Sequence, residues 1–140
     1  MKTIVLSVIM FLPVLLQAQK IGDNQITITL SDTTNIYRQV KIAMVKTDFI
    51  VKDDYNMDTL TTYGREFTSM AGNCVCIAII NGNKVVLNGY YSLKKMDVMG
   101  FTFDSDEYQK MMFYKTSKTW GLIQRIADRL SGTKVYSKEL

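Results

Sequence analysis

The chain has 140 residues, of which 47% are hydrophobic, 21% charged and 11% aromatic, with one proline, two cysteines and no histidine. This composition is typical of one globular domain and excludes a disulfide scaffold, a collagen-like or disordered chain and a two-domain enzyme. The lack of histidine also excludes Ser-His-Asp and Cys-His relays, HExxH zinc sites and histidine pH switches. The net charge of +4 is too mild and too evenly spread to indicate a nucleic-acid partner.

The first 18 residues have the pattern of a secretory signal peptide. Lys2 gives a positive start, an apolar run extends from Ile4 to Leu16, and Ala18 is a small residue at the expected cleavage site. The run is shorter than the roughly 20 residues that a membrane-spanning helix needs, and no later stretch reaches that length. We therefore predict a signal peptide at residues 1–18 and a single extracytoplasmic domain, periplasmic or secreted, at residues 19–140. An uncleaved anchor or a buried strand is the alternative interpretation.

The start of the predicted domain reads as a strand followed by a helix. Residues 25–30 (QITITL) alternate apolar and polar side chains, which predicts a half-buried strand. Residues 31–34 offer several side-chain oxygens that can cap a helix. Apolar residues then recur with helical spacing from Ile36 to about Lys46, so we predict a helix there.

The next segments are rich in β-forming residues separated by turn formers. We predict a short strand at residues 49–52, a turn at 53–56 and a β-rich stretch at 59–68. Gly64 within that stretch predicts a bulge or a bend. Gly72-Asn73 predicts a further turn.

A β-hairpin is the strongest local signal. Residues 74–80 form an apolar strand, Asn81-Gly82-Asn83 a tight turn and residues 84–91 the returning strand, because Asn-Gly accepts the positive φ of hairpin turns. The following segment is harder to interpret. Residues 99–103 are typical of a strand, and residues 104–114 of a short helix or a further extended piece.

The end of the chain predicts a second amphipathic helix from Ser117 or Thr119 to Leu130, with Gly132 as its C-cap and a last edge strand at Val135-Tyr136. The order of elements predicts an α+β fold of two layers. In this fold an antiparallel sheet carries both helices on one face. The other face is left exposed or partly exposed.

Several of these segments together form a recognisable pattern. They are the helix around Tyr37, Phe49-x-Val51 with the acidic turn after it, Leu60-x-Thr62, Val85–Tyr91 and Trp120–Leu130. The pattern resembles small secreted bacterial domains of unknown function with a TBP-like fold, the fold of the TATA-binding-protein repeat. The resemblance covers roughly residues 25–136 and implies the order β-α-β-β-β-β-α. It brings no assigned reaction and no catalytic residue.

Cys74 and Cys76 lie two residues apart, so on a strand their sulfurs share one face. A redox pair or half of a metal site is one interpretation. However, two thiolates without histidine or further cysteine cannot complete a zinc shell in one chain, and a disulfide across one residue strains an extended strand. We therefore interpret both as small buried apolar residues, and predict no metal site and no cofactor.

Acidic residues occur in two groups, Asp53-Asp54 and Asp104-x-Asp106-Glu107. Such groups serve in glycoside hydrolysis or in calcium binding, but neither spacing matches an EF-hand loop and both lie in turn-like sequence. We interpret them as solvated turn residues. A small hydrolase that uses Asp53, Asp54 or Asp104 remains the alternative function.

The segment from Tyr90 to Trp120 is unusually rich in aromatic residues and methionine. Such residues often form pockets or partner contacts, and a domain this small cannot bury all of them. A lid that closes the core is the alternative. The predicted binding residues are Tyr90, Tyr91, Phe101, Phe103, Met111, Met112 and Tyr114.

These observations predict a non-catalytic binding domain. It would hold a protein partner or an apolar ligand through the uncovered sheet face and residues 90–120. A structural subunit of an envelope assembly is a further alternative, which would appear as a homo-oligomer with a large dry interface.

Overall fold

The computed structural model describes residues 18–52, 56–67, 72–93, 96–98, 101–103, 107–115 and 117–140. These residues form nine strands and two helices. The strands are β1 (Gln25–Leu30), β2 (Thr59–Thr61), β3 (Arg65–Phe67), β4 (Gly72–Asn81), β5 (Lys84–Leu93), β6 (Met96–Val98), β7 (Phe101–Phe103), β8 (Gln109–Lys110) and β9 (Gly132–Ser137). The helices are α1 (Ile36–Val45) and α2 (Lys118–Asp128).

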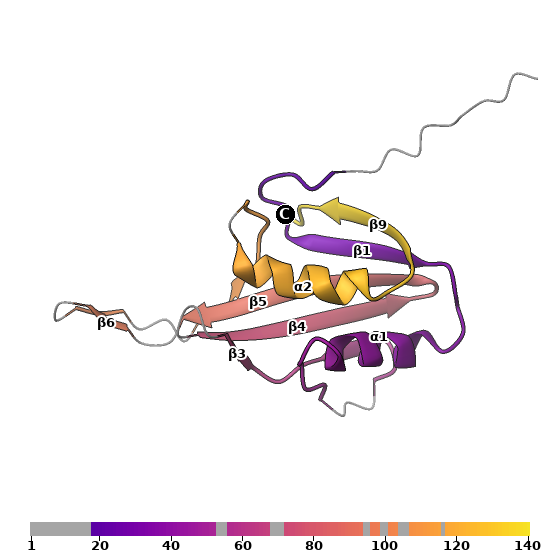
Figure 1. The fold of residues 1–140 in the computed structure, drawn as a ribbon, viewed down its shortest axis with the longest axis horizontal. Coiled ribbons are helices and arrows are strands. Elements are labelled where there is room, and N and C mark those ends of the chain that lie inside the picture. Colours follow the sequence, from indigo (N-terminus) through magenta and orange to yellow (C-terminus); the bar gives the residue numbers. More distant parts are fainter. Residues whose placement is uncertain are drawn as a thin grey trace, which may run out of the picture.

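Seven strands form one antiparallel sheet, which confirms the α+β class. Its main path runs β2-β4-β5-β1-β9, with β3 also beside β4 and β8 also beside β5 (Figure 1). β6 and β7 pair only with each other, as a separate ribbon. The predicted edge strand at the end of the chain is confirmed, since β9 pairs with β1 along its whole length.

The β4–β5 hairpin occupies the centre of the sheet. Asn81 pairs with Lys84, which leaves Gly82 and Asn83 as a two-residue loop. Gly82 has φ +58, and glycine at the first position of such a loop is typical of a type II′ turn. The predicted hairpin is therefore confirmed, and its strands are longer than the sequence indicated.

The turn predicted at Gly72-Asn73 is wrong. Gly72 pairs with Leu93 and Asn73 with Ser92, so both residues belong to β4. On its other side the same stretch pairs with β3. Ladder hydrogen bonds on both sides of β4 outweigh the turn preference of Gly-Asn, which is a local effect only.

α1 begins where predicted, but its N-cap is Asn35 rather than a residue of 31–34. Asn35 has φ 48, and its side chain accepts a hydrogen bond from the Arg38 N–H. Asparagine adopts this left-handed conformation more readily than most residues. α2 is capped by Ser117, whose side chain accepts a hydrogen bond from the Trp120 N–H. Ser117 is one of the two predicted starts of this helix.

Gly132 does not cap α2, contrary to the prediction. The helix ends with Arg129 as a right-handed C-cap, and Gly132 is the first residue of β9. A Cβ atom at Gly132 would lie 2.1 Å from the Thr29 carbonyl oxygen. Glycine is therefore required by the close approach of β9 to β1.

The segment at residues 49–52 is also not a regular strand. Val51 forms one isolated bridge to Thr62, and Asp48 before it has φ 64. Phe49 is buried. The chain therefore turns after α1, anchors Phe49 in the core and pairs only briefly with residues 61–63, where the Lys52 N–H donates to the Thr61 carbonyl and the Tyr63 N–H to the Ile50 carbonyl.

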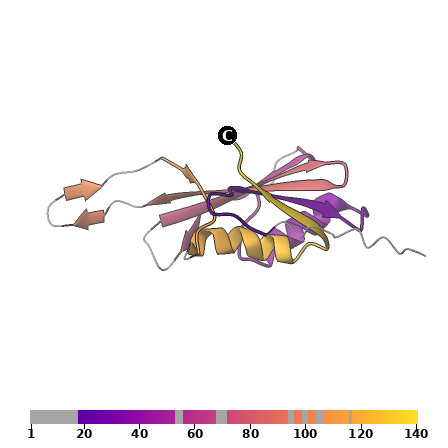
Figure 2. The ribbon, with the colours of Figure 1, turned by 90° about the horizontal axis from the view of Figure 1, so that it is seen from above.

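The core lies between the sheet and the two helices, which cover the same face (Figure 2). α1 packs against α2 and β4, and α2 packs against β1 and β5. Burial alternates along β1 and β4, as expected for strands with one covered face. The most buried side chains include Ile26, Ile28, Val40, Met44, Phe49, Leu60, Leu87, Met111, Ile123 and Ile126.

Among the residues that the structure describes, neither helix is long and apolar enough to cross a bilayer. The predicted signal peptide falls almost wholly outside those residues.

Gly89 of β5 is required by the close packing of α2. A Cβ atom there would lie 2.1 Å from Ile123 Cδ1 and 2.6 Å from Met111 Sδ. We expect Gly89→Ala to lower the free energy of unfolding by about 1–3 kcal/mol, because overpacking displaces core side chains. Urea unfolding measures this change.

Gly121→Ala is the matched control, because a Cβ atom there meets nothing within 4 Å. A glycine inside a helix costs about 0.5–1 kcal/mol relative to alanine, so this variant is expected to be more stable than the parent. Equal effects of the two substitutions would contradict the packing described at Gly89.

Candidate functional site

The sheet face opposite the helices is the candidate site. Side chains on it come from alternate positions of the strands, and cross-strand register places Val75 beside Tyr90 and Ile79 beside Val86. These side chains are half-buried or exposed, while their neighbours on the helix side are buried. The face therefore presents aliphatic and aromatic groups that neither helix covers.

A hollow of about 370 Å³ lies on this face. Val75 and Ile77 of β4 and Tyr90 of β5 are among its half-buried residues, whereas Tyr63 and Tyr108 are 54% and 48% exposed. The complete lining is Lys52, Thr62, Tyr63, Gly64, Val75, Ile77, Tyr90 and Tyr108. The volume falls within the range of small-molecule sites.

Thr62 lies between β2 and β3 and holds that side of the hollow against β4. Its backbone N–H donates to the Cys76 carbonyl at 3.0 Å, and its Oγ1 accepts from the Cys76 N–H at 2.9 Å. The Thr62 side chain is completely buried. Pairing with β4 is therefore held at this residue, although regular β2 pairing ends at Thr61 and β3 pairing begins at Arg65.

The break between β2 and β3 allows Tyr63 and Tyr108 to reach the hollow. The Tyr63 N–H donates to the Ile50 carbonyl at 2.8 Å, so it bonds to the segment after α1 and not to β4. A Cβ atom on Gly64 would lie 3.5 Å from Tyr108 Oη, so the Tyr108 hydroxyl lies close to this glycine. The bulge or bend predicted at Gly64 is a bulge, since residues 62–64 stand opposite only Val75 and Cys76 between the Thr61–Ile77 and Arg65–Cys74 pairs. Tyr63 and Tyr108 line one hollow there.

One cation lies beside these aromatic rings. Lys52 Nζ is 5.4 Å from the Tyr63 ring centroid, within the distance of a cation–π contact. The described lining therefore combines aliphatic contacts, tyrosine faces and a few hydrogen-bonding groups. Such a surface suits an apolar or aromatic group with a polar or anionic end.

Among the predicted binding residues whose side chains the structure describes, only Tyr90 lines the hollow. Tyr91 is on the helix side, packs against the core, and donates from its hydroxyl to Gln109 Oε1 at 3.1 Å. Met112 is half-buried and Tyr114 is 48% exposed, and neither lines the hollow. Phe101 and Phe103 form β7, but their side chains lie outside what the structure describes.

Met111 is a core residue and not a surface contact. It is completely buried, and its backbone N–H donates to the Gly89 carbonyl at 2.8 Å. This bond directly follows the β8–β5 pairing at Lys110. The segment is therefore held extended against β5, which directs Met111 toward Gly89 and the core.

Tyr63 and Tyr108 were not among the predicted residues, and neither were Val75 and Ile77. Strand alternation gives a signal for Val75 and Ile77, since every residue from Cys74 to Ile80 is apolar and one set must lie away from the helices. No local pattern links Tyr63 to Tyr108. Only the pairing of β8 with β5 and of β3 with β4 brings them together.

Cys74 and Cys76 lie on the opposite, helix-covered face. Both are free and buried, which confirms their interpretation as small core residues. Burial raises the pKa of each thiol to about 12, although the positive charge of Arg65 opposes the rise at Cys74. A reactive thiolate at neutral pH is therefore disfavoured.

The two acidic groups lie mostly outside the residues that the structure describes. Asp53, Asp54, Asp104 and Asp106 lie outside the described residues, and Glu107 is exposed. In the described part of the chain, no three His, Cys, Asp or Glu side chains come together as a metal site would require.

Comparisons with protein-family models, curated proteins and solved structures gave no match to this chain.

The two thiols are expected to react slowly with iodoacetamide in the native protein. At pH 9 a rise in pKa from 9.0 to about 12 makes the thiolate fraction about 500-fold smaller than in the unfolded chain. Mass spectrometry of alkylated protein, with and without urea, measures the difference. Equal rates in both conditions would restore the interpretation as a reactive pair.

The same shift predicts a pH dependence of stability. The folded state keeps its thiol protons to higher pH than the unfolded state. This difference in proton binding stabilises the folded state below pH 9, and the stabilisation is lost as pH rises from 9 toward 12.

Proposed function

We propose that residues 19–140 form an extracytoplasmic, non-catalytic binding domain. The hollow between Tyr63, Tyr90 and Tyr108 holds an apolar ligand or an apolar group of a protein partner. The observation that carries this proposal is the position of the hollow. It lies on the face that neither helix covers, and aromatic and aliphatic side chains line it. A hollow lined mainly by apolar and aromatic groups with a few polar ones favours binding of an apolar group.

We also propose that the fold is TBP-like. This rests on the resemblance between residues 25–136 and that family, and on an antiparallel sheet backed by two helices on one face. The proposal of export rests on the pattern of residues 1–18 alone. Mass spectrometry of the protein recovered from the producing cell tests export directly, since cleavage leaves a chain that begins at Gln19.

Binding in the hollow is tested with the dye 1-anilinonaphthalene-8-sulfonate, which has aromatic rings and one anionic group. Removal of two rings by Tyr63→Ala with Tyr108→Ala is expected to weaken dye binding about tenfold, because each aromatic contact contributes about 0.5–1.5 kcal/mol. Fluorescence titration measures the dissociation constant.

Tyr114→Ala is the matched control. Tyr114 and Tyr108 are both 48% exposed, but Tyr114 does not line the hollow. The control is expected to bind the dye as the parent does. Equal weakening in both variants, or none in the double variant, would refute a site in the hollow. Photo-crosslinking from position 108, with position 114 as the control, extends the test to protein partners in the cell.

A further inference from the structure

The outer surface of α1 is a second site, separate from the hollow on the sheet. Val40, Ala43 and Met44 are buried beneath the helix. Residues about half a turn away from them, Arg38 and Ile42 among others, face outward. The second site therefore lies on the helix layer, whereas the proposed ligand site lies on the other face of the sheet.

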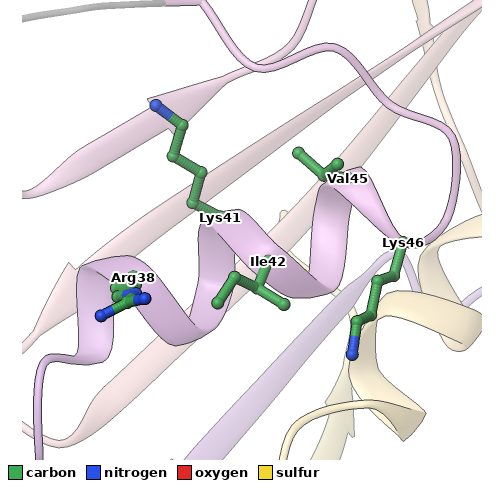
Figure 3. A pocket seen from close by; sticks show the side chains of 5 residues that line it. All are labelled: Arg38, Lys41, Ile42, Val45 and Lys46. Atoms are coloured by element: carbon green, nitrogen blue, oxygen red, sulfur yellow. The ribbon is translucent and has the colours of Figure 1, made fainter.

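This outer surface combines exposed aliphatic side chains with cations. Ile42 and Val45 are 43% and 53% exposed and line a hollow of about 420 Å³. Its other lining residues are Arg38, Lys41 and Lys46 (Figure 3). In Figure 3, Arg38 and Lys46 lie at the two ends of the labelled stretch, with Ile42 and Val45 between them.

Among the described residues that line this hollow, every charged side chain is a cation. α1 contains no acidic residue. The nearest acids along the chain are Asp32 before the helix and Asp48 after it. Asp48 Oδ2 is 3.3 Å from Arg65 Nη2, and Asp32 accepts a hydrogen bond from the Thr34 N–H. The charged side chains that line the hollow are cations, so this surface is complementary to an anionic partner.

We propose that α1 rests on the surface of a bilayer that contains anionic phospholipids. Ile42 and Val45 insert between the headgroups, while Arg38 and Lys46 contact phosphate groups. Long cationic side chains suit this arrangement, since their stems lie along apolar surface and their charged ends reach outward. A bilayer also needs no shape complementarity from the protein.

The size of the surface favours a bilayer over a protein. A ten-residue helix is about 15 Å long and 10–12 Å wide. A stable protein interface covers about 800 Å² of each partner, several times the area of that footprint. Binding to an anionic membrane instead increases with each cation near the surface, by about 1 kcal/mol, and with each inserted apolar group.

Sedimentation with lipid vesicles tests the proposal. It uses the protein in the form that the producing cell yields, with phosphatidylcholine vesicles that contain or lack phosphatidylglycerol. Binding is expected only with the anionic lipid, and is expected to fall as salt is raised. Arg38→Gln with Lys46→Gln is expected to weaken the partition coefficient roughly 25-fold, since each cation contributes about fivefold. Ile42→Ser with Val45→Ser is expected to weaken it several-fold.

Lys84→Gln with Lys138→Gln is the matched control, because it removes the same charge from two exposed lysines away from α1. Its partition coefficient is expected to fall less than threefold. Every variant carries the same N-terminal segment, so any contribution of that segment cancels. Absence of binding to anionic vesicles, equal binding to neutral vesicles, or equal loss in the control would each overturn the proposal. None of these outcomes bears on dye binding in the sheet hollow.

Discussion

The contact between α2 and β5 is the constraint on which the rest of the fold depends. Ile123 reaches the sheet only because Gly89 has no side chain, and Met111 fills the space beside it. These three residues come from a helix, the central hairpin and the segment after β8. The same contact therefore fixes where α2 lies, holds residues 109–111 against β5 and closes the core at that end.

One-sided packing alone does not account for the apolar residues on both faces of β4. Cys74, Cys76 and Ala78 are small and buried, and they face the helices. Val75 and Ile77 are larger and face the hollow. Small residues allow a helix layer to approach the sheet closely, whereas larger residues on the free face give a ligand a surface to contact. A strand in a purely structural sheet with one wet face would carry polar residues at the second set of positions.

Local patterns were sufficient to predict most of the regular elements. The alternation in residues 25–30, the helical spacing after Ile36 and the Asn81-Gly82 turn each act over a few neighbours, and all three are confirmed. The errors arise where distant segments meet. Gly72 and Gly132 read locally as a turn and a helix cap, but one is needed in a ladder and the other in a close strand approach.

The candidate site was less predictable for the same reason. The abundance of aromatic residues and methionine in one segment led to the selection of Met111, which bonding to Gly89 directs into the core. The same criterion omitted Tyr63, which lies outside that segment. Tyr63 and Tyr108 are 45 positions apart and meet because β3 and β8 flank the same hairpin. Such a meeting depends on strand order, which no local periodicity encodes.

The positions of the two proposed sites limit what the hollow can bind. α1 belongs to the layer that covers one face of the sheet, and the hollow with Tyr90 opens on the other face. When α1 lies on a bilayer, the sheet stands between the membrane and the hollow. A lipid chain in that bilayer then cannot reach Tyr63 or Tyr108 without the domain leaving the surface. The two sites are compatible only with a ligand or partner that approaches from the aqueous side, and this favours a soluble apolar molecule or a protein segment over a membrane lipid.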